Sequence, residues 1–213
     1  MEFTFAKWKL PFQLTKTPIL SFLPGYNHLI FITDRLSRSI SDFAGFALPE
    51  QIRNIIIGNL FYVLVPFIMF KLLGYRFKGL LSLRYARASW PILLIYLVMF
   101  FSGGITINKV WGFVYCLLYP ALCEEFFHRG IIYRSASSIF KKVPVALLAG
   151  TIAFGLMHFP DYFFRIYNGN LLLSFSNIAD LLLFGFLLSY GYQKTTTLLP
   201  WILVHALSDA LYL

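Results

Sequence analysis

The chain has 213 residues, of which 59% are hydrophobic, 19% are aromatic and only 13% are charged. Soluble domains carry about 25% charged residues, so this composition excludes a soluble globular domain. The apolar runs are continuous, and a segment that crosses a bilayer must satisfy its own backbone hydrogen bonds. We therefore predict an all-α polytopic transmembrane bundle, a multi-pass protein of the cell membrane.

The net charge of +9 is consistent with this class of protein. The basic residues cluster between the apolar runs, which is typical of cytoplasmic loops in contact with anionic lipid. The pattern predicts the lipid bilayer as a partner and argues against nucleic acid.

Residues 1–53 are predicted to form an N-terminal interfacial region. A weak span at 17–33 is interrupted by Pro24, Gly25, Asn27 and His28, and it is short for the ~20 residues that a spanning helix needs. The transmembrane bundle is predicted to occupy residues 54–213.

Six spans are expected in the bundle, or seven if residues 17–33 also cross. The first is predicted at 54–74, with a kink at Pro66. The third contains the adjacent carboxylates Glu124 and Glu125. The others are predicted at 88–101, 143–159, 171–192 and 201–213, the last beginning near Thr196.

The loops alternate in charge along the chain. Basic residues gather at 71–87, at 134–142 and at Lys194, whereas the loops at 103–109 and 160–170 are weakly charged. Because cytoplasmic loops carry an excess of Lys and Arg, we predict that the three basic segments lie on the cytoplasmic side.

Glu124 and Glu125 follow an uncharged run from Val110 to Leu122. Adjacent helical residues point about 100° apart, whereas residues four apart share a face. Glu125 is therefore predicted to pair with Arg129, which leaves Glu124 available for chemistry. The motif alone leaves open a second interpretation, a solvated helix end.

Two histidines stand in otherwise apolar helices. His158 follows Phe154 by four residues, and His205 precedes Asp209 by four. A single histidine of this kind is more often a packing residue, but intramembrane ionisable residues face the bundle interior or a wet cavity. Glu124, His158, His205 and Asp209 are therefore predicted to converge, with the Glu124 carboxylate within about 6 Å of both imidazoles.

Helix rise limits how this convergence can form. Glu124 lies ten residues from Arg134, whereas His158 lies fifteen residues from Val143. At a rise of ~1.5 Å per residue, the two side chains would lie at different depths in the membrane. The common site thus predicts that the fourth span begins later, near Ala146 or Leu147. The sequence leaves the role of Asp180 open, and capping or pairing inside the bundle is one interpretation.

A carboxylate with two imidazoles suits hydrolysis, because glutamate can take a proton from water and histidine can hold the water, stabilise an oxyanion or bind a metal. The zinc-protease pattern His-Glu-x-x-His and the serine-hydrolase pattern Gly-x-Ser-x-Gly are both absent. Cys116 and Cys123 are expected to be buried as small hydrophobic residues.

Three ordered motifs resemble those of the CPBP family, which comprises CAAX prenyl endopeptidases, bacterial Abi proteins and bacteriocin-processing or self-immunity proteins. They are Glu124-Glu125-x-x-x-Arg129-Gly130, Phe154-x-x-x-His158 and His205-x-x-x-Asp209. The resemblance covers residues 110–213.

The resemblance implies an intramembrane endopeptidase that cleaves a membrane-associated peptide or protein. Glu124 would activate the water, assisted by His158, and Arg129 would hold Glu125. His205 and the residue at 209 would stabilise the oxyanion or complete a metal site. Glu124, His158 and His205 would be the ligands if a divalent metal such as zinc is bound, and the residues leave that requirement open.

Two residues depart from the family pattern. Asp209 stands where Asn is more common, and an ionised Asp cannot donate to an oxyanion. It suits a metal or a hydrogen bond to His205 better. His128 stands where the family usually has an apolar residue, and it has no assigned role.

Three other classes of protein share parts of this pattern. A non-catalytic bacteriocin-immunity or scaffold protein would keep the same motifs. A proton-coupled transporter is disfavoured because the halves of the chain show no repeat. A di-iron bundle is rejected because Glu-x-x-His occurs once, at Glu125 and His128.

Overall fold

The computed structural model describes residues 49–77, 79–82 and 86–212. The predicted span at 17–33 and nearly all of the predicted interfacial region lie outside them. The regular structure of the described residues is helical throughout, with no strand among them. This confirms the all-α fold class.

The first described helix is continuous from α2 (Glu50–Gly58) through a π-helical segment (Asn59–Leu64) to α3 (Val65–Leu72). Pro66 is the second residue of α3 and lies inside this continuous helix. Because proline has no N–H to donate, it interrupts the helical hydrogen-bond ladder at this point, next to the π-helical segment.

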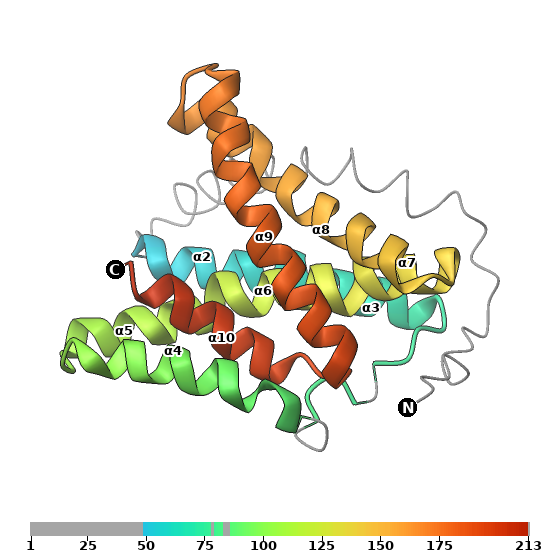
Figure 1. Ribbon diagram of the computed structural model, residues 1–213, viewed down its shortest axis with the longest axis horizontal. Coiled ribbons are helices and arrows are strands. Elements are labelled where there is room, and N and C mark those ends of the chain that lie inside the picture. The colour runs from blue at the N-terminus through green and yellow to red at the C-terminus, as the bar shows by residue number, and fades with distance from the viewer. Residues whose placement is uncertain (1–48, 78, 83–85, 213) are drawn as a thin grey trace.

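The next two helices form a hairpin (Figure 1), consisting of α4 (Trp90–Ser102), which follows a short 3₁₀ turn (Ala86–Ser89), and α5 (Ile107–Cys116). The connecting loop is shorter than the predicted 103–109. Thr106 caps α5 by accepting a hydrogen bond from the backbone N–H of Lys109 at 3.2 Å. The Lys109 ammonium bonds back to the carbonyl of Phe100.

The glutamates lie on a long bent helix. After α5 it continues as a π-helical segment (Leu117–Ala121), α6 (Leu122–Glu125), a second π-helical segment (Phe126–Tyr133) and α7 (Arg134–Phe140). The backbone leaves the helical region at Tyr119, before a cis peptide bond to Pro120. The Tyr119 ring lies against Gly58 of α2, where a Cβ would be only 2.3 Å away.

Helices α8 (Val143–Pro160) and α9 (Leu171–Thr195) form an antiparallel pair that projects beyond the other helices (Figure 1), and a π-helical segment (Asp161–Ile166) extends α8. Two glycines allow the close approach. A Cβ on Gly155 would lie 2.7 Å from Leu182, and one on Gly185 would lie 2.8 Å from Phe154. Small residues at helix contacts are typical of membrane bundles.

The last helix, α10 (Leu199–Ala210), packs against α4 and α5. Its start is fixed by Trp201, whose indole N–H donates to Thr195 Oγ1 at 2.8 Å. The Trp201 ring also occupies the space beside Gly191 of α9. These contacts set the position of His205, one turn further along α10.

Four helices in the described residues are long and apolar enough to cross a membrane, namely Glu50–Leu72, Ile107–Phe140, Val143–Ile166 and Leu171–Thr195. The helices that correspond to the second and last predicted spans are shorter, at 13 and 12 residues. The predicted count of six to seven spans is therefore not confirmed.

The prediction that the fourth span begins near Ala146 or Leu147 is wrong, because α8 begins at Val143. The error lay in the neighbouring helix. That helix does not end near Arg134 but continues to Phe140. Glu124 then lies sixteen residues from Phe140 and His158 fifteen residues from Val143, so the depths of the two residues agree.

Candidate active site

Glu124 and Glu125 end α6 and face different surroundings. The Glu125 side chain is fully buried, whereas 16% of the Glu124 side chain is exposed. This is the division that the 100° turn between neighbours predicts.

Glu125 forms the predicted ion pair with Arg129, in which Nη1 donates to Oε1 at 2.8 Å. Both side chains are fully buried. The guanidinium also donates through Nη2 to the carbonyl of Gly185 at 3.1 Å, and it lies 4.4 Å from the centre of the Phe154 ring. The arginine thereby connects three helices.

A second contact of Glu125 was not predicted. Its Oε1 accepts a hydrogen bond from Nδ1 of His205 at 2.8 Å. The two residues lie 80 positions apart, so no local spacing in the sequence could have indicated the pair. Glu125 thus orients His205 as well as binding Arg129.

His158 is oriented by the backbone of its own helix. Its Nδ1 lies 2.9 Å from the carbonyl oxygen of Phe154, and a carbonyl can only accept. Nδ1 therefore carries the proton, and Nε2 faces Glu124 Oε2 at 3.6 Å. In the neutral imidazole this Nε2 is the basic nitrogen.

The second imidazole completes the predicted convergence. His205 Nε2 lies 3.9 Å from Glu124 Oε2 and 3.6 Å from Asp209 Oδ2. The Glu124 carboxylate is thus within 4 Å of both imidazoles, inside the predicted ~6 Å. Separations above 3.5 Å between polar groups suit a water molecule that bridges them.

Phe154 packs against the histidines of this cluster. Its ring is buried and packs against three imidazoles, with centroid separations of 4.9 Å to His158, 5.0 Å to His128 and 6.3 Å to His205. The motif phenylalanine therefore fixes the rings that surround Glu124.

His128 and Asp180, whose roles the sequence leaves open, have different surroundings. His128 is buried among aromatic rings, and neither of its ring nitrogens has a hydrogen-bond partner among the described residues. Asp180 is exposed on α9, so it does not pair inside the bundle. Both cysteines are buried and free, as predicted.

The residue chemistry, but not the geometry, suits a metal. Each histidine has its Nδ1 fixed and its Nε2 directed toward a carboxylate, as in many metal sites. However, no group of three or more His, Cys, Asp and Glu side chains in the described part of the chain is arranged to hold a metal ion.

Comparison with protein families places the site in context. Residues 106–211 match the model of the family described as Type II CAAX prenyl endopeptidase Rce1-like. The chain belongs to this family. The match confirms the resemblance stated from the three motifs, and all of the residues gathered around Glu124 lie within it. Comparison with curated proteins and with solved structures found no match. Membership of the Rce1-like family supports a membrane-embedded endopeptidase of the CAAX type in general.

Proposed function

We propose that the protein hydrolyses a peptide bond within the membrane by means of a water molecule activated by Glu124. The substrate is a membrane-associated peptide or protein. The observation that carries the proposal is the convergence of Glu124 with His158 and His205, at 3.6 and 3.9 Å, from three separate helices.

The first step is attack of water on the scissile carbonyl carbon. Glu124 Oε2 removes one proton from the water, and Nε2 of His158 holds the water in place as an acceptor. The oxygen–carbon bond forms while the carbonyl oxygen takes the negative charge.

His205 is placed to stabilise that charge. Its Nδ1–H is bound by Glu125, so its Nε2 is presented to the reacting groups. When protonated, Nε2 donates to the oxyanion, and the nearby carboxylate of Asp209 favours the protonated form. The C–N bond then breaks, and the proton held by Glu124 passes to the leaving amine.

Cleavage by purified protein in liposomes, assayed with a panel of fluorogenic peptides, tests the proposal. Glu124→Gln is expected to lower the rate by about 10²- to 10⁴-fold, the range for loss of a general base. Asp161→Asn is the matched control, because the exposed carboxylate of Asp161 pairs with Arg165 and not with Glu124 or the two histidines. A Glu124→Gln variant that cleaves as fast as the control would show that Glu124 is not the base. Absence of cleavage by the unmodified protein as well would favour the non-catalytic immunity or scaffold function.

A chelator tests whether the cleavage reaction requires a bound metal ion. Exhaustive treatment with a chelator is expected to leave the cleavage rate unchanged, because the proposed reaction needs only water. Loss of activity that added zinc restores would show instead that Glu124, His158 and His205 act as metal ligands.

A further inference from the structure

The long central helix is interrupted just before the glutamate that the proposed reaction uses as its base. The backbone is extended at Tyr119, and Pro120, which has no N–H to donate, lies inside the helix. We refer to Leu117–Ala121 as the break. Glu124 is the third residue of α6, the single helical turn that follows the break. The direction in which the chain leaves the break therefore decides where the Glu124 carboxylate lies.

One backbone hydrogen bond is displaced at the break. In an α-helix the N–H of Leu122 would bond to the carbonyl of Leu118, four residues earlier. In this structure it bonds to the carbonyl of Leu117. The Leu118 carbonyl is thereby released from its α-helical partner. Because unpaired backbone groups are costly inside a membrane, a donor from another helix stabilises the chain at this point.

That donor is Asn59, the first residue of the π-helical segment that follows α2. Its Nδ2 donates to the carbonyl of Leu118 at 3.0 Å, across 59 positions of sequence. The same nitrogen donates to the carbonyl of Ile55 in its own helix at 2.8 Å. A side-chain amide has two N–H groups, so Asn59 can bond to both helices at once.

The residue before Asn59 brings the two helices close enough for this bond. Gly58 is buried, and a Cβ there would lie 2.3 Å from the Tyr119 ring and 3.4 Å from Cys123 Sγ. Gly58 thus contacts the chain on both sides of Pro120. The first helix therefore fixes the break in two ways, by close packing at Gly58 and by a hydrogen bond at Asn59.

The chain is anchored separately after Glu124. The fully buried pair of Glu125 and Arg129 fixes the helix there at 2.8 Å. The contacts of Glu124 itself with the two imidazoles are longer, at 3.6 and 3.9 Å. The position of Glu124 is thus set by the anchors on either side of it, Asn59 before and Glu125 after.

We propose that Asn59 is a positioning residue for Glu124. It bonds to backbone carbonyls and acts on the reaction only through the direction in which α6 leaves the break. A misplacement of about 1 Å can lower the rate of an enzyme by about 10²-fold. The effect on cleavage rests on the proposed function, whereas the attachment of Asn59 to the break does not.

Kinetic measurements test the effect on cleavage. Asn59→Leu has a similar shape but cannot donate, and kcat is expected to fall by about 10- to 100-fold with KM nearly unchanged. Asn59→Gln keeps the amide donor and is expected to retain most of the rate. Asn54→Leu is the matched control, because Asn54 lies on the same helix and donates to the Tyr115 hydroxyl, before the break, at 3.4 Å. Its kcat is expected to be unchanged.

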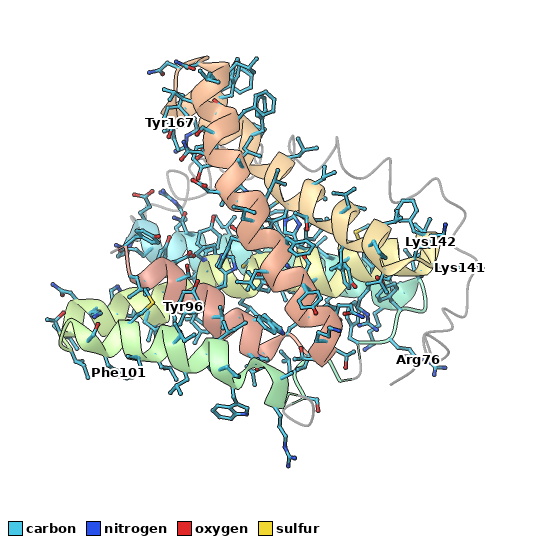
Figure 2. The ribbon with its side chains drawn as sticks, viewed as in Figure 1. Arg76, Tyr96, Phe101, Lys141, Lys142 and Tyr167 are labelled. Carbon is cyan, nitrogen blue, oxygen red and sulfur yellow. The ribbon has the colours of Figure 1, made fainter. Side chains whose placement is uncertain are left out.

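Amide hydrogen exchange in micelles, measured by mass spectrometry, tests the attachment without any assay of cleavage. Residues 117–125 are expected to exchange faster in Asn59→Leu than in the unmodified protein, because local opening of the break becomes easier. Asn54→Leu is expected to leave their exchange unchanged. The turn at Lys141 and Lys142 lies at the edge of the molecule, beyond the other end of the central helix (Figure 2), and is the internal control.

Three results would overturn the proposal. They are unchanged exchange of residues 117–125 in Asn59→Leu, faster exchange with an unchanged kcat, and an equal loss of kcat in Asn54→Leu, which would indicate general destabilisation. Failure of the proposed hydrolysis would look different, because the unmodified protein would then not cleave at all. The exchange experiment would still decide whether Asn59 fixes the break.

Discussion

The site has two layers with different roles, a closed layer that positions side chains and an open layer that contacts the reactants. In the closed layer, Glu125 and Arg129 have no exposure and form hydrogen bonds with α9 and α10. In the open layer, Glu124 and Asp209 are partly exposed, and their polar contacts exceed 3.5 Å. The closed layer is thus bonded directly, while the open layer leaves space for reactants. Neighbouring glutamates belong to different layers because they point about 100° apart.

Removal of a charge from the closed layer should cause the largest loss of stability. Glu125→Ala strands the buried guanidinium of Arg129, and loss of one partner of a buried pair costs about 3–5 kcal/mol. We expect a strong loss of stability on SDS unfolding in micelles and a low yield of folded protein.

The double variant Glu125→Ala with Arg129→Met sharpens this prediction. It leaves no stranded charge, so much of the stability should return. Activity should stay low, because His205 has lost the carboxylate that orients it. Full recovery of both properties would show that Glu125 has no positioning role.

Strain in the closed layer should have an intermediate effect. Gly185→Ala places a Cβ 2.8 Å from the Phe154 ring, and overpacking of this kind costs about 1–3 kcal/mol. Because Phe154 packs against His158 and His205, the cleavage rate should fall as well.

Gly130→Ala is the control for that variant. Its added Cβ would lie 3.4 Å from Leu198, which is an ordinary van der Waals contact. Unfolding of the two variants is compared in the same detergent, and equal stability would contradict the close-packing argument.

A change in the open layer should have the smallest effect. Asp209→Asn removes one of the two carboxylates near His205 Nε2, and partly exposed ion pairs are worth about 0.2–1 kcal/mol. The cleavage rate should change by at most about fivefold. A change of a hundredfold or more would place Asp209 among the catalytic residues rather than beside them.

The local contacts of the site could be predicted from the sequence, and the long-range ones could not. The pair Glu125–Arg129 and the contact of His205 with Asp209 both follow from a spacing of four. The hydrogen bonds from His205 to Glu125 and from Arg129 to Gly185 join residues 80 and 56 positions apart. They depend on how the helices pack, which periodicity does not encode.

The ends of the helices were the weakest part of the prediction. Composition placed the apolar runs but not the extension of the central helix to Phe140, because Ser and Lys residues after Arg134 are typical of a loop. The last span was predicted to be short, at 201–213, and α10 is a short helix that begins and ends two or three residues earlier.

The shortness of α10 has a consequence for where the protein can work. Twelve residues span about 18 Å, well below the ~30 Å hydrocarbon thickness of a bilayer. A lipid-facing helix of that length would have to thin or distort the membrane around it. Because α10 is enclosed by protein and anchored through Trp201, the height of His205 is fixed by α9 and not by lipid. The alignment of the two histidines should therefore be the same in thin and in thick membranes.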